Sequence, residues 1–238
     1  MSPASVHTPN GSDSRPPSRA DSMRSIATIE SDEIPAYYKV SHGRRFYSQR
    51  LGYSPYVLPA DPREMERLNL QHETIKLLIA GNHLGPVEEI LASDQGGRQR
   101  VVMDLGTGSG IWVEQMAHAF PHVKFIGVDL VPTATSYPPE HVRFECYNFV
   151  QHNIRHPDAS VDFVHARFLS LGISNYPGLL NEIARVLRPG GLFFSGEWDL
   201  THRTPTGAAL SASWRTIADA ERMFIRALHD RELGDIAA

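Results

Sequence analysis

Three glycines that alternate with single residues follow an acidic residue near the middle of the chain, and this spacing suits a ligand that lies against the backbone. The segment reads DLGTGSG from Asp104 to Gly110. Glycine adopts positive φ without strain and lets a ligand approach the main chain closely. A helix that begins just after the glycines would direct its free N–H groups toward the same place. The D-x-G-x-G-x-G spacing differs from the G-x-G-x-x-G of dinucleotide enzymes, so it disfavours a nicotinamide-dependent oxidoreductase.

A second acidic residue, Asp129, follows the apolar segment Val123–Val128. An acid at the carboxyl end of a strand beside a glycine turn can accept hydrogen bonds from both ribose hydroxyls of an adenosine ligand. The alternative is an acid in a surface turn with no ligand. Because the glycine turn is expected beside it, we favour the ribose role.

A parallel sheet is the arrangement that would bring these two segments together. From Val101 onward the hydrophobic pattern alternates between strand and helix, which is typical of a doubly wound α/β fold. The expected strands are Val101–Leu105, Val123–Val128, Val142–Tyr147, Val161–His165 and Leu192–Ser195. The expected helices are Ile111–Phe120, Tyr176–Leu187 and Ala208–Leu233, with a stop-and-turn at Arg188–Gly191.

Two segments precede this domain, which we place at residues 96–238. Residues 1–33 are rich in Ser, Pro and Thr, and such a segment buries too little apolar surface to offset its ordering entropy, so a disordered tail is predicted. Residues 34–95 begin with closely spaced tyrosines interleaved with basic residues. That mixture can bind nucleic acid, but a lid whose charged groups reach water is the favoured interpretation.

The same segment also contains helix signals, which predict a helical extension before the sheet. Asp61 is a good N-cap, Pro62 suits the first turn, and Gly81 can end the helix. Along it, His72 falls on the apolar face, where a core or pocket-lining role is favoured over a metal ligand. A second, shorter helix is expected at Pro86–Leu91.

Composition restricts the classes of function further. The chain has 238 residues, a formal net charge of -4 and a sequence pI of about 6.3, which argues against non-specific binding of nucleic acid. The single cysteine, Cys146, cannot form an intrachain disulfide, which favours the cytoplasm or nucleus. The twelve histidines do not cluster at metal-ligand spacing, so no metal is expected. No transmembrane segment or signal peptide is predicted.

Taken in order, these segments resemble the class I S-adenosylmethionine-dependent methyltransferases. The glycine turn matches their first motif, Val161–Arg167 resembles their fourth-strand motif, and Leu187–Gly191 (LRPGG) resembles the turn that follows. The resemblance implies a Rossmann-like fold and S-adenosyl-L-methionine as cofactor. Family members often carry an acid near the position of Asn148; here the amide carbonyl would accept from the adenine amino group, and Phe149 would pack on the ring.

More closely, the chain resembles the fungal LaeA-like methyltransferases, including the velvet-interacting VipC and VapB type. The segments that carry the resemblance are Tyr47–Asp61, Glu66–His72, Asp104–Trp112, Gly127–Leu130 and Asp162–Arg167. The resemblance implies a nuclear and cytoplasmic regulator of transcription, development and secondary metabolism. It also implies partner subunits, either velvet-type or a second methyltransferase-like chain, and no direct contact with nucleic acid.

One departure from the superfamily concerns the C-terminal end. Its members usually add a two-stranded antiparallel hairpin after the helix expected at Ala208–Leu233, whereas this sequence stops at Ala238. We therefore expect the hairpin to be missing: the sequence is truncated, a partner chain covers the edge strand, or the final helix packs unusually. An exposed edge strand usually needs covering.

These inferences define a candidate cofactor site and two functional hypotheses. The expected cofactor-binding residues are Asp104, Gly106, Thr107, Gly108, Gly110, Asp129, Leu130, Asn148, Phe149 and Ala166. No catalytic base is identifiable; if the acceptor is a protein lysine or arginine, candidates are His165, His72 or a tyrosine of the lid. The first hypothesis is a methyltransferase of unknown acceptor, and the second is a regulatory subunit that retains the fold and acts through protein contacts.

Overall fold

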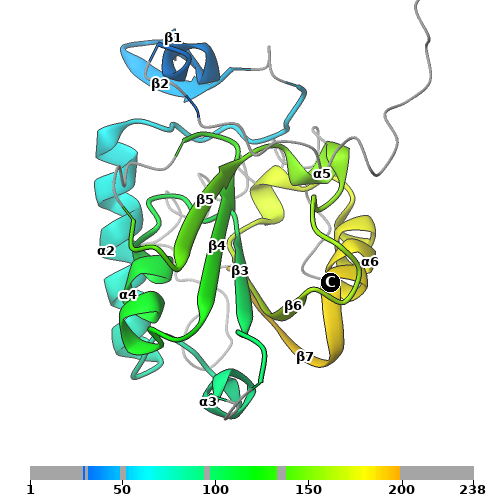
Figure 1. The fold of residues 1–238 in the computed structure, drawn as a ribbon. Coiled ribbons are helices and arrows are strands. Elements are labelled where there is room, and N and C mark those ends of the chain that lie inside the picture. The colour runs from blue at the N-terminus through cyan, green and yellow to red at the C-terminus, as the bar shows by residue number, and fades with distance from the viewer. Residues whose placement is uncertain (1–28, 30–31, 49–51, 94–96, 133–137, 199–238) are drawn as a thin grey trace, which may run out of the picture.

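Five parallel strands form the centre of the chain in the computed structural model, which describes residues 29, 32–48, 52–93, 97–132 and 138–198. The strands are β3 (Val101–Leu105), β4 (Lys124–Asp129), β5 (Val142–Cys146), β6 (Val161–Arg167) and β7 (Leu187–Gly196). Their order is β5-β4-β3-β6-β7, so the chain runs outward from β3 in both directions (Figure 1). This is the predicted doubly wound sheet, and its switch point lies between β3 and β6. Residues 1–28 and 30–31 of the predicted tail and the helix expected at Ala208–Leu233 lie outside the described residues.

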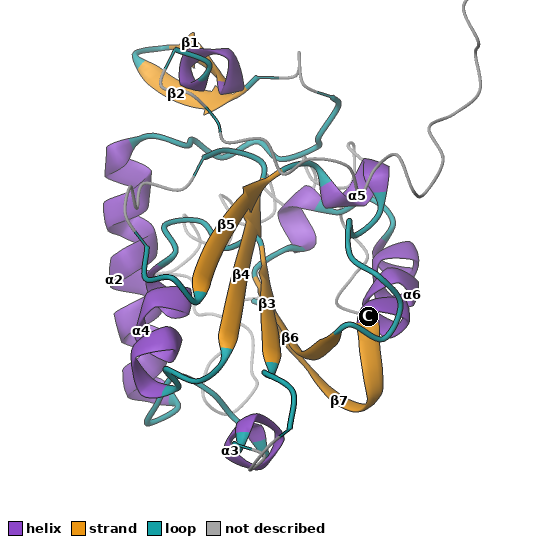
Figure 2. Ribbon diagram, in the orientation of Figure 1, coloured by secondary structure: helices purple, strands orange, loops and turns teal. Residues whose placement is uncertain are grey.

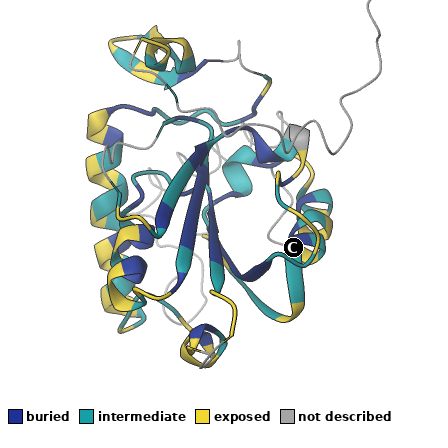
Figure 3. Cartoon of the chain, in the orientation of Figure 1, coloured by how far each residue is buried: buried dark blue, intermediate teal, exposed yellow. Residues whose placement is uncertain are grey.

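Both faces of this sheet are buried, because successive residues of each strand point to opposite faces. On one face, Met103 and Val164 pack with the helices α5 (Phe149–His152) and α6 (Tyr176–Val186). On the other face, Val102 and Phe163 pack with α3 (Val87–Leu91) and α4 (Ile111–Ala119). The helices therefore form one layer on each side of the sheet (Figure 2), and the strands between them are the most deeply buried part of the molecule (Figure 3).

The predicted stop-and-turn at Arg188–Gly191 is wrong, because this segment belongs to β7. Leu187 pairs with Val161 and Leu192 pairs with Phe163, so the extra residues are absorbed by a register shift within the strand. Such a bulge lets one strand carry more residues than its partner. Gly190 accommodates it with a positive φ of 79°.

The N-terminal part of the described chain forms a hairpin and a long helix. After a 3-10 turn at Ile34–Tyr37, the strands β1 (Tyr38–Ser41) and β2 (Arg44–Tyr47) pair with each other in an antiparallel hairpin. Helix α2 (Pro62–Leu78) follows. The hairpin is separate from the central sheet, and its Tyr47 packs with Val131, which lies just beyond the end of β4.

The capping signals before α2 are confirmed. Asp61 accepts the N–H of Glu64 at 3.1 Å and also forms an ion pair with Arg44 of β2 at 2.6 Å. The ion pair lowers the pKa of the Asp61 carboxyl, with the N–H of Glu64 acting in the same direction. One residue therefore starts the helix and ties it to the hairpin. At the other end, Ala80 adopts the left-handed conformation (φ 57°) in place of the predicted Gly81. None of the helices in these ranges is both long and apolar enough to cross a membrane.

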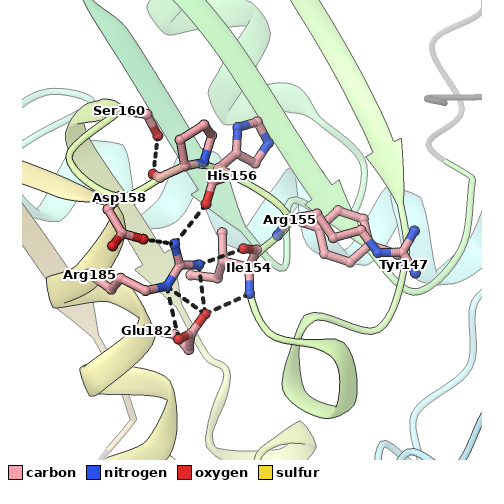
Figure 4. A network of polar contacts seen from close by, with 9 residues as sticks. Tyr147, Ile154, Arg155, His156, Asp158, Ser160, Glu182 and Arg185 are labelled. Atoms are coloured by element: carbon pink, nitrogen blue, oxygen red, sulfur yellow. Dashed lines mark hydrogen bonds and ion pairs between the residues drawn. The ribbon is translucent and has the colours of Figure 1, made fainter. Parts of the chain in front are cut away.

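The connection between β5 and β6 is held to α6 by a polar network in which Arg185 makes the most contacts (Figure 4). Arg185 donates to the carbonyl oxygens of Ile154 at 2.7 Å and His156 at 2.8 Å, and it forms ion pairs with Glu182 and Asp158. Backbone carbonyls in a loop need such partners when water cannot reach them. The side chain of Arg185 thus supplements the backbone hydrogen bonds that Ala159 and Ser160 donate to the end of α6.

Replacing Arg185 with leucine is expected to lower the free energy of unfolding by about 2–4 kcal/mol, because two carbonyls and Glu182 lose a charged donor. Urea unfolding followed by circular dichroism measures the loss. Asp158→Ala is the matched control: its carboxylate is 68% exposed, so a change within about 0.5 kcal/mol is expected. Equal losses in the two variants would show that the exposed ion pair, and not the carbonyl contacts, carries the stabilisation.

Candidate functional site

A cavity of about 540 Å³ opens at the carboxyl ends of β3, β4 and β6. Its size is within the range of small-molecule sites, and the switch point of a doubly wound sheet is where such sites form. Helix α2 contributes Leu68 and His72 to the wall, and the segment before α2 contributes Tyr56 and Leu58. The cavity therefore lies between the sheet and the N-terminal extension.

The glycine turn forms one wall of this cavity, and its glycines cannot be replaced without strain. Gly106, Gly108 and Gly110 all have positive φ, of 69°, 56° and 82°. A Cβ on Gly106 would lie 2.4 Å from Cδ2 of Leu169, and a Cβ on Gly108 would lie 3.0 Å from Cδ1 of Leu68. The absence of side chains thus keeps open the space into which a ligand would fit.

The carboxylate of Asp129 is fixed beside this turn by backbone donors. Its Oδ2 accepts the N–H of Gly108 at 2.8 Å, and its Oδ1 accepts the N–H of Leu130 at 2.7 Å. Burial raises the pKa of the Asp129 carboxyl, while these N–H groups oppose that rise. Each carboxylate oxygen can accept further hydrogen bonds. Asp129 lines the cavity, so the geometry fits a ligand with two neighbouring hydroxyls.

Asn148 links the end of β5 to the N-terminal extension. Its Nδ2 donates to the carbonyl of Tyr53 at 2.8 Å, and its Oδ1 accepts the N–H of Val150 at 3.1 Å. The predicted acceptance of an adenine amino group would have to share Oδ1 with that N–H. That role for Asn148 therefore stays a prediction, whereas its contact with Tyr53 positions the wall of the cavity.

His165 is a core residue that orients Asp104. The ring stacks on Trp112 at a centroid distance of 3.7 Å and on Phe194 at 5.5 Å, and the residue is only 2% exposed. Burial lowers the pKa of His165, which leaves the ring neutral with Nδ1–H donating to Oδ1 of Asp104 at 2.7 Å. In this tautomer Nε2 is the proton-accepting nitrogen, and His165 is among the residues that line the cavity. The role of His165 as a base therefore stays a prediction.

Two tyrosines of the aromatic segment lie at the cavity, where the lid was expected. Tyr47 and Tyr56 are among the lining residues. Burial raises the pKa of Tyr56 well above its ordinary value, so its hydroxyl stays protonated near neutral pH. A protonated phenol in this position can exclude water and can donate a hydrogen bond to a ligand.

The loop after β6 forms the remaining wall. Phe168 is left-handed (φ 57°) and stacks on Trp198 at a centroid distance of 5.2 Å. The carboxylate of Glu197 accepts the N–H of Leu169 at 2.9 Å, which ties the loop to the residue that follows β7. A strained non-glycine residue is often found at a binding site. The stacked pair and the role of Glu197 were not predicted from the sequence.

The structure brings most of the expected cofactor residues together. Those that line the cavity are Asp104, Gly106, Thr107, Gly108, Asp129, Leu130, Asn148 and Phe149. Gly110 and Ala166 do not: Gly110 caps the N-terminus of α4 and Ala166 is fully buried within β6. Arg167 and His72, which were not among the expected cofactor residues, also line the cavity.

Comparison with known proteins is consistent with this site. A family model described as a methyltransferase domain matches residues 81–235. A secondary metabolism regulator laeA from Coprinopsis cinerea is 39% identical over 146 residues, which cover 60% of this chain and 36% of that protein. The methyltransferase pytC of Aspergillus terreus is 33% identical over 65% of this chain and 44% of its own length. The laeA regulator of Aspergillus flavus is 29% identical over 76% of this chain and 46% of its own length. The chain thus spans less than half of each of these curated relatives.

Proposed function

The chain belongs to the family of methyltransferase domains, and we propose that it transfers a methyl group from S-adenosyl-L-methionine, its cofactor, to an acceptor that enters the same cavity. The observation that carries the proposal is the carboxylate of Asp129. It is held by the N–H groups of Gly108 and Leu130 at the edge of a ligand-sized cavity. A ribose with two free hydroxyls is the complement of such a carboxylate.

The chemistry divides between cofactor and protein. S-adenosylmethionine, when bound, supplies an electrophilic methyl group on its sulfonium, so the protein needs chiefly to align the acceptor and exclude water. The glycine turn would receive the adenosyl part, and Asp129 would hold its ribose. Tyr56, Phe168 and Trp198 form an aromatic surface around the remaining space, which limits access of water to the reacting atoms.

The wider role that we propose is regulation of fungal secondary metabolism and development. Its support is the similarity to two proteins that are described as secondary metabolism regulators. We propose further that the chain acts in the nucleus and cytoplasm together with partner subunits, of the velvet type or a second methyltransferase-like chain. Expression as a tagged chain, followed by mass spectrometry of co-purifying proteins, tests this part separately from the chemistry.

A second candidate function is a regulatory subunit that binds the cofactor with little or no turnover. The observation that favours it concerns the candidate bases: the ring of His165 is stacked between Trp112 and Phe194 and is only 2% exposed, and Tyr56 stays protonated. Acceptors that need no base, such as a thiolate or a neutral amine, are still compatible with the first function.

Calorimetric titration followed by a transfer assay separates the two functions. We expect S-adenosylmethionine and S-adenosylhomocysteine to bind, NAD not to bind, and radiolabel from methyl-labelled cofactor to enter a protein or metabolite fraction of a fungal extract. Binding without transfer would favour the regulatory subunit. No binding at millimolar cofactor would contradict both.

A further inference from the structure

We propose that Arg167 and His72 form a carboxylate-binding subsite on the inner wall of the cavity. The proposal rests on the proposed function in so far as the carboxylate belongs to the amino-acid part of the cofactor. The same chemistry would serve a carboxylate on the methyl acceptor, and the experiment below distinguishes the two sources.

The two residues meet although they are far apart in the sequence. Arg167 is the last residue of β6, and His72 lies on α2. Nη2 of Arg167 donates to Nδ1 of His72 at 2.9 Å, and both residues line the cavity. The histidine accepts this hydrogen bond only in its neutral form, so the pair carries the single positive charge of the guanidinium.

This charge lacks the carboxylate partner that several other arginines of the described residues have. Arg44, Arg98 and Arg185 each form an ion pair with an aspartate. Within the described residues, no carboxylate lies at ion-pair distance from Arg167; the charge of Asp104 is the only one that favours its protonated form. Asp104 already accepts a hydrogen bond from His165. A partly buried cation with a neutral partner is costly unless an anion completes it.

The position along the strand ends indicates what that anion is attached to. Asp129 ends β4, the glycine turn follows β3, and Arg167 ends β6, and these three strands are adjacent in the order β4-β3-β6. Neighbouring strands lie about 4.8 Å apart, so Asp129 and Arg167 stand roughly 10 Å apart across the sheet edge. An elongated ligand with a ribose at one end and a carboxylate at the other would reach both. The planar guanidinium matches a carboxylate with two parallel hydrogen bonds.

Affinities for two ligands that differ only at the amino-acid end test the proposal. The probes are S-adenosylhomocysteine and 5′-methylthioadenosine, which lacks the amino-acid group, titrated calorimetrically into the full chain. We expect Arg167→Gln to lower the affinity for S-adenosylhomocysteine at least tenfold. The affinity for 5′-methylthioadenosine should change less than twofold. Arg167→Lys should recover part of the loss, because it restores the charge without the planar fork. His72→Phe should also lower the affinity for S-adenosylhomocysteine more than that for 5′-methylthioadenosine, but by a smaller factor than Arg167→Gln.

Arg155→Gln is the matched control, because the guanidinium of Arg155 lies over the ring of Tyr147 outside the cavity; both affinities should stay unchanged. Circular dichroism and the melting midpoint verify that each variant is folded. If Arg167→Gln leaves both ligands unaffected, benzoate is titrated into the chain saturated with S-adenosylhomocysteine. Benzoate binding that is lost in Arg167→Gln supports a carboxylate on the acceptor, and benzoate binding that is absent or unchanged overturns the subsite.

Failure of the proposed function gives a different result. In that case the unmodified chain binds neither S-adenosylhomocysteine nor 5′-methylthioadenosine. Benzoate is then titrated into the cofactor-free chain and into Arg167→Gln. Benzoate binding that is lost in the variant supports the carboxylate-binding subsite, and equal binding, or no binding, in both proteins overturns it.

Discussion

Replacing Gly108 with valine is expected to abolish binding of S-adenosylhomocysteine, with an affinity loss of more than 100-fold. Gly108 has a φ of 56°, a conformation that costs L-residues roughly 1–2 kcal/mol and β-branched residues more. Its Cβ would lie 3.0 Å from Cδ1 of Leu68, so the new side chain would occupy the cavity. The strained turn would also displace the N–H that fixes Oδ2 of Asp129.

Isothermal titration calorimetry measures this loss, and Gly85→Val provides the matched control. Gly85 also has a positive φ, of 81°, but a Cβ there meets nothing within 4 Å and the residue does not line the cavity. The control should therefore lose a similar amount of stability while keeping its affinity. If Gly108→Val binds as tightly as the unmodified chain, the turn does not contact the ligand and the proposed site is wrong.

The parts of the site that the sequence predicts are those set by short-range patterns. The strand Val101–Leu105 is predicted with its observed bounds because its residues are buried on both faces and it ends at glycines. The position of Asp129 beside the turn follows from the same rule, since the carboxyl ends of adjacent parallel strands share one edge. The N-cap Asp61 is predicted because capping needs only residues three positions apart.

The parts that the sequence does not predict depend on contacts between distant segments. The hydrogen bond from Asn148 to Tyr53 and that from Arg167 to His72 each join residues 95 positions apart. No local pattern records which side chain of one element meets which side chain of another. The bulge at Gly190 is missed for a related reason: an RPGG sequence has the composition of a turn, and only pairing with β6 makes it part of a strand.

Replacing Asp129 with alanine is expected to lower the affinity for S-adenosylhomocysteine by about 100-fold, because two charged hydrogen bonds of roughly 1.5 kcal/mol each would be lost. The same substitution also removes the acceptor of the Gly108 N–H, so a simple loss of affinity would not prove contact with the ribose. A double-mutant cycle with the 2′,3′-dideoxy analogue of S-adenosylhomocysteine separates the two effects.

In the unmodified chain the analogue should bind about 100-fold more weakly than S-adenosylhomocysteine, whereas in Asp129→Ala the two ligands should bind within a few-fold of each other. The distortion of the turn lowers the affinity for both ligands by the same factor, so it cancels when the two affinities are compared. The remaining difference reports the interaction between the carboxylate and the hydroxyls. If the analogue binds more weakly than S-adenosylhomocysteine by the same factor in both proteins, another group recognises the ribose. Asp129 would then serve only to hold Gly108, and the feature on which the proposed function depends would have a purely structural explanation.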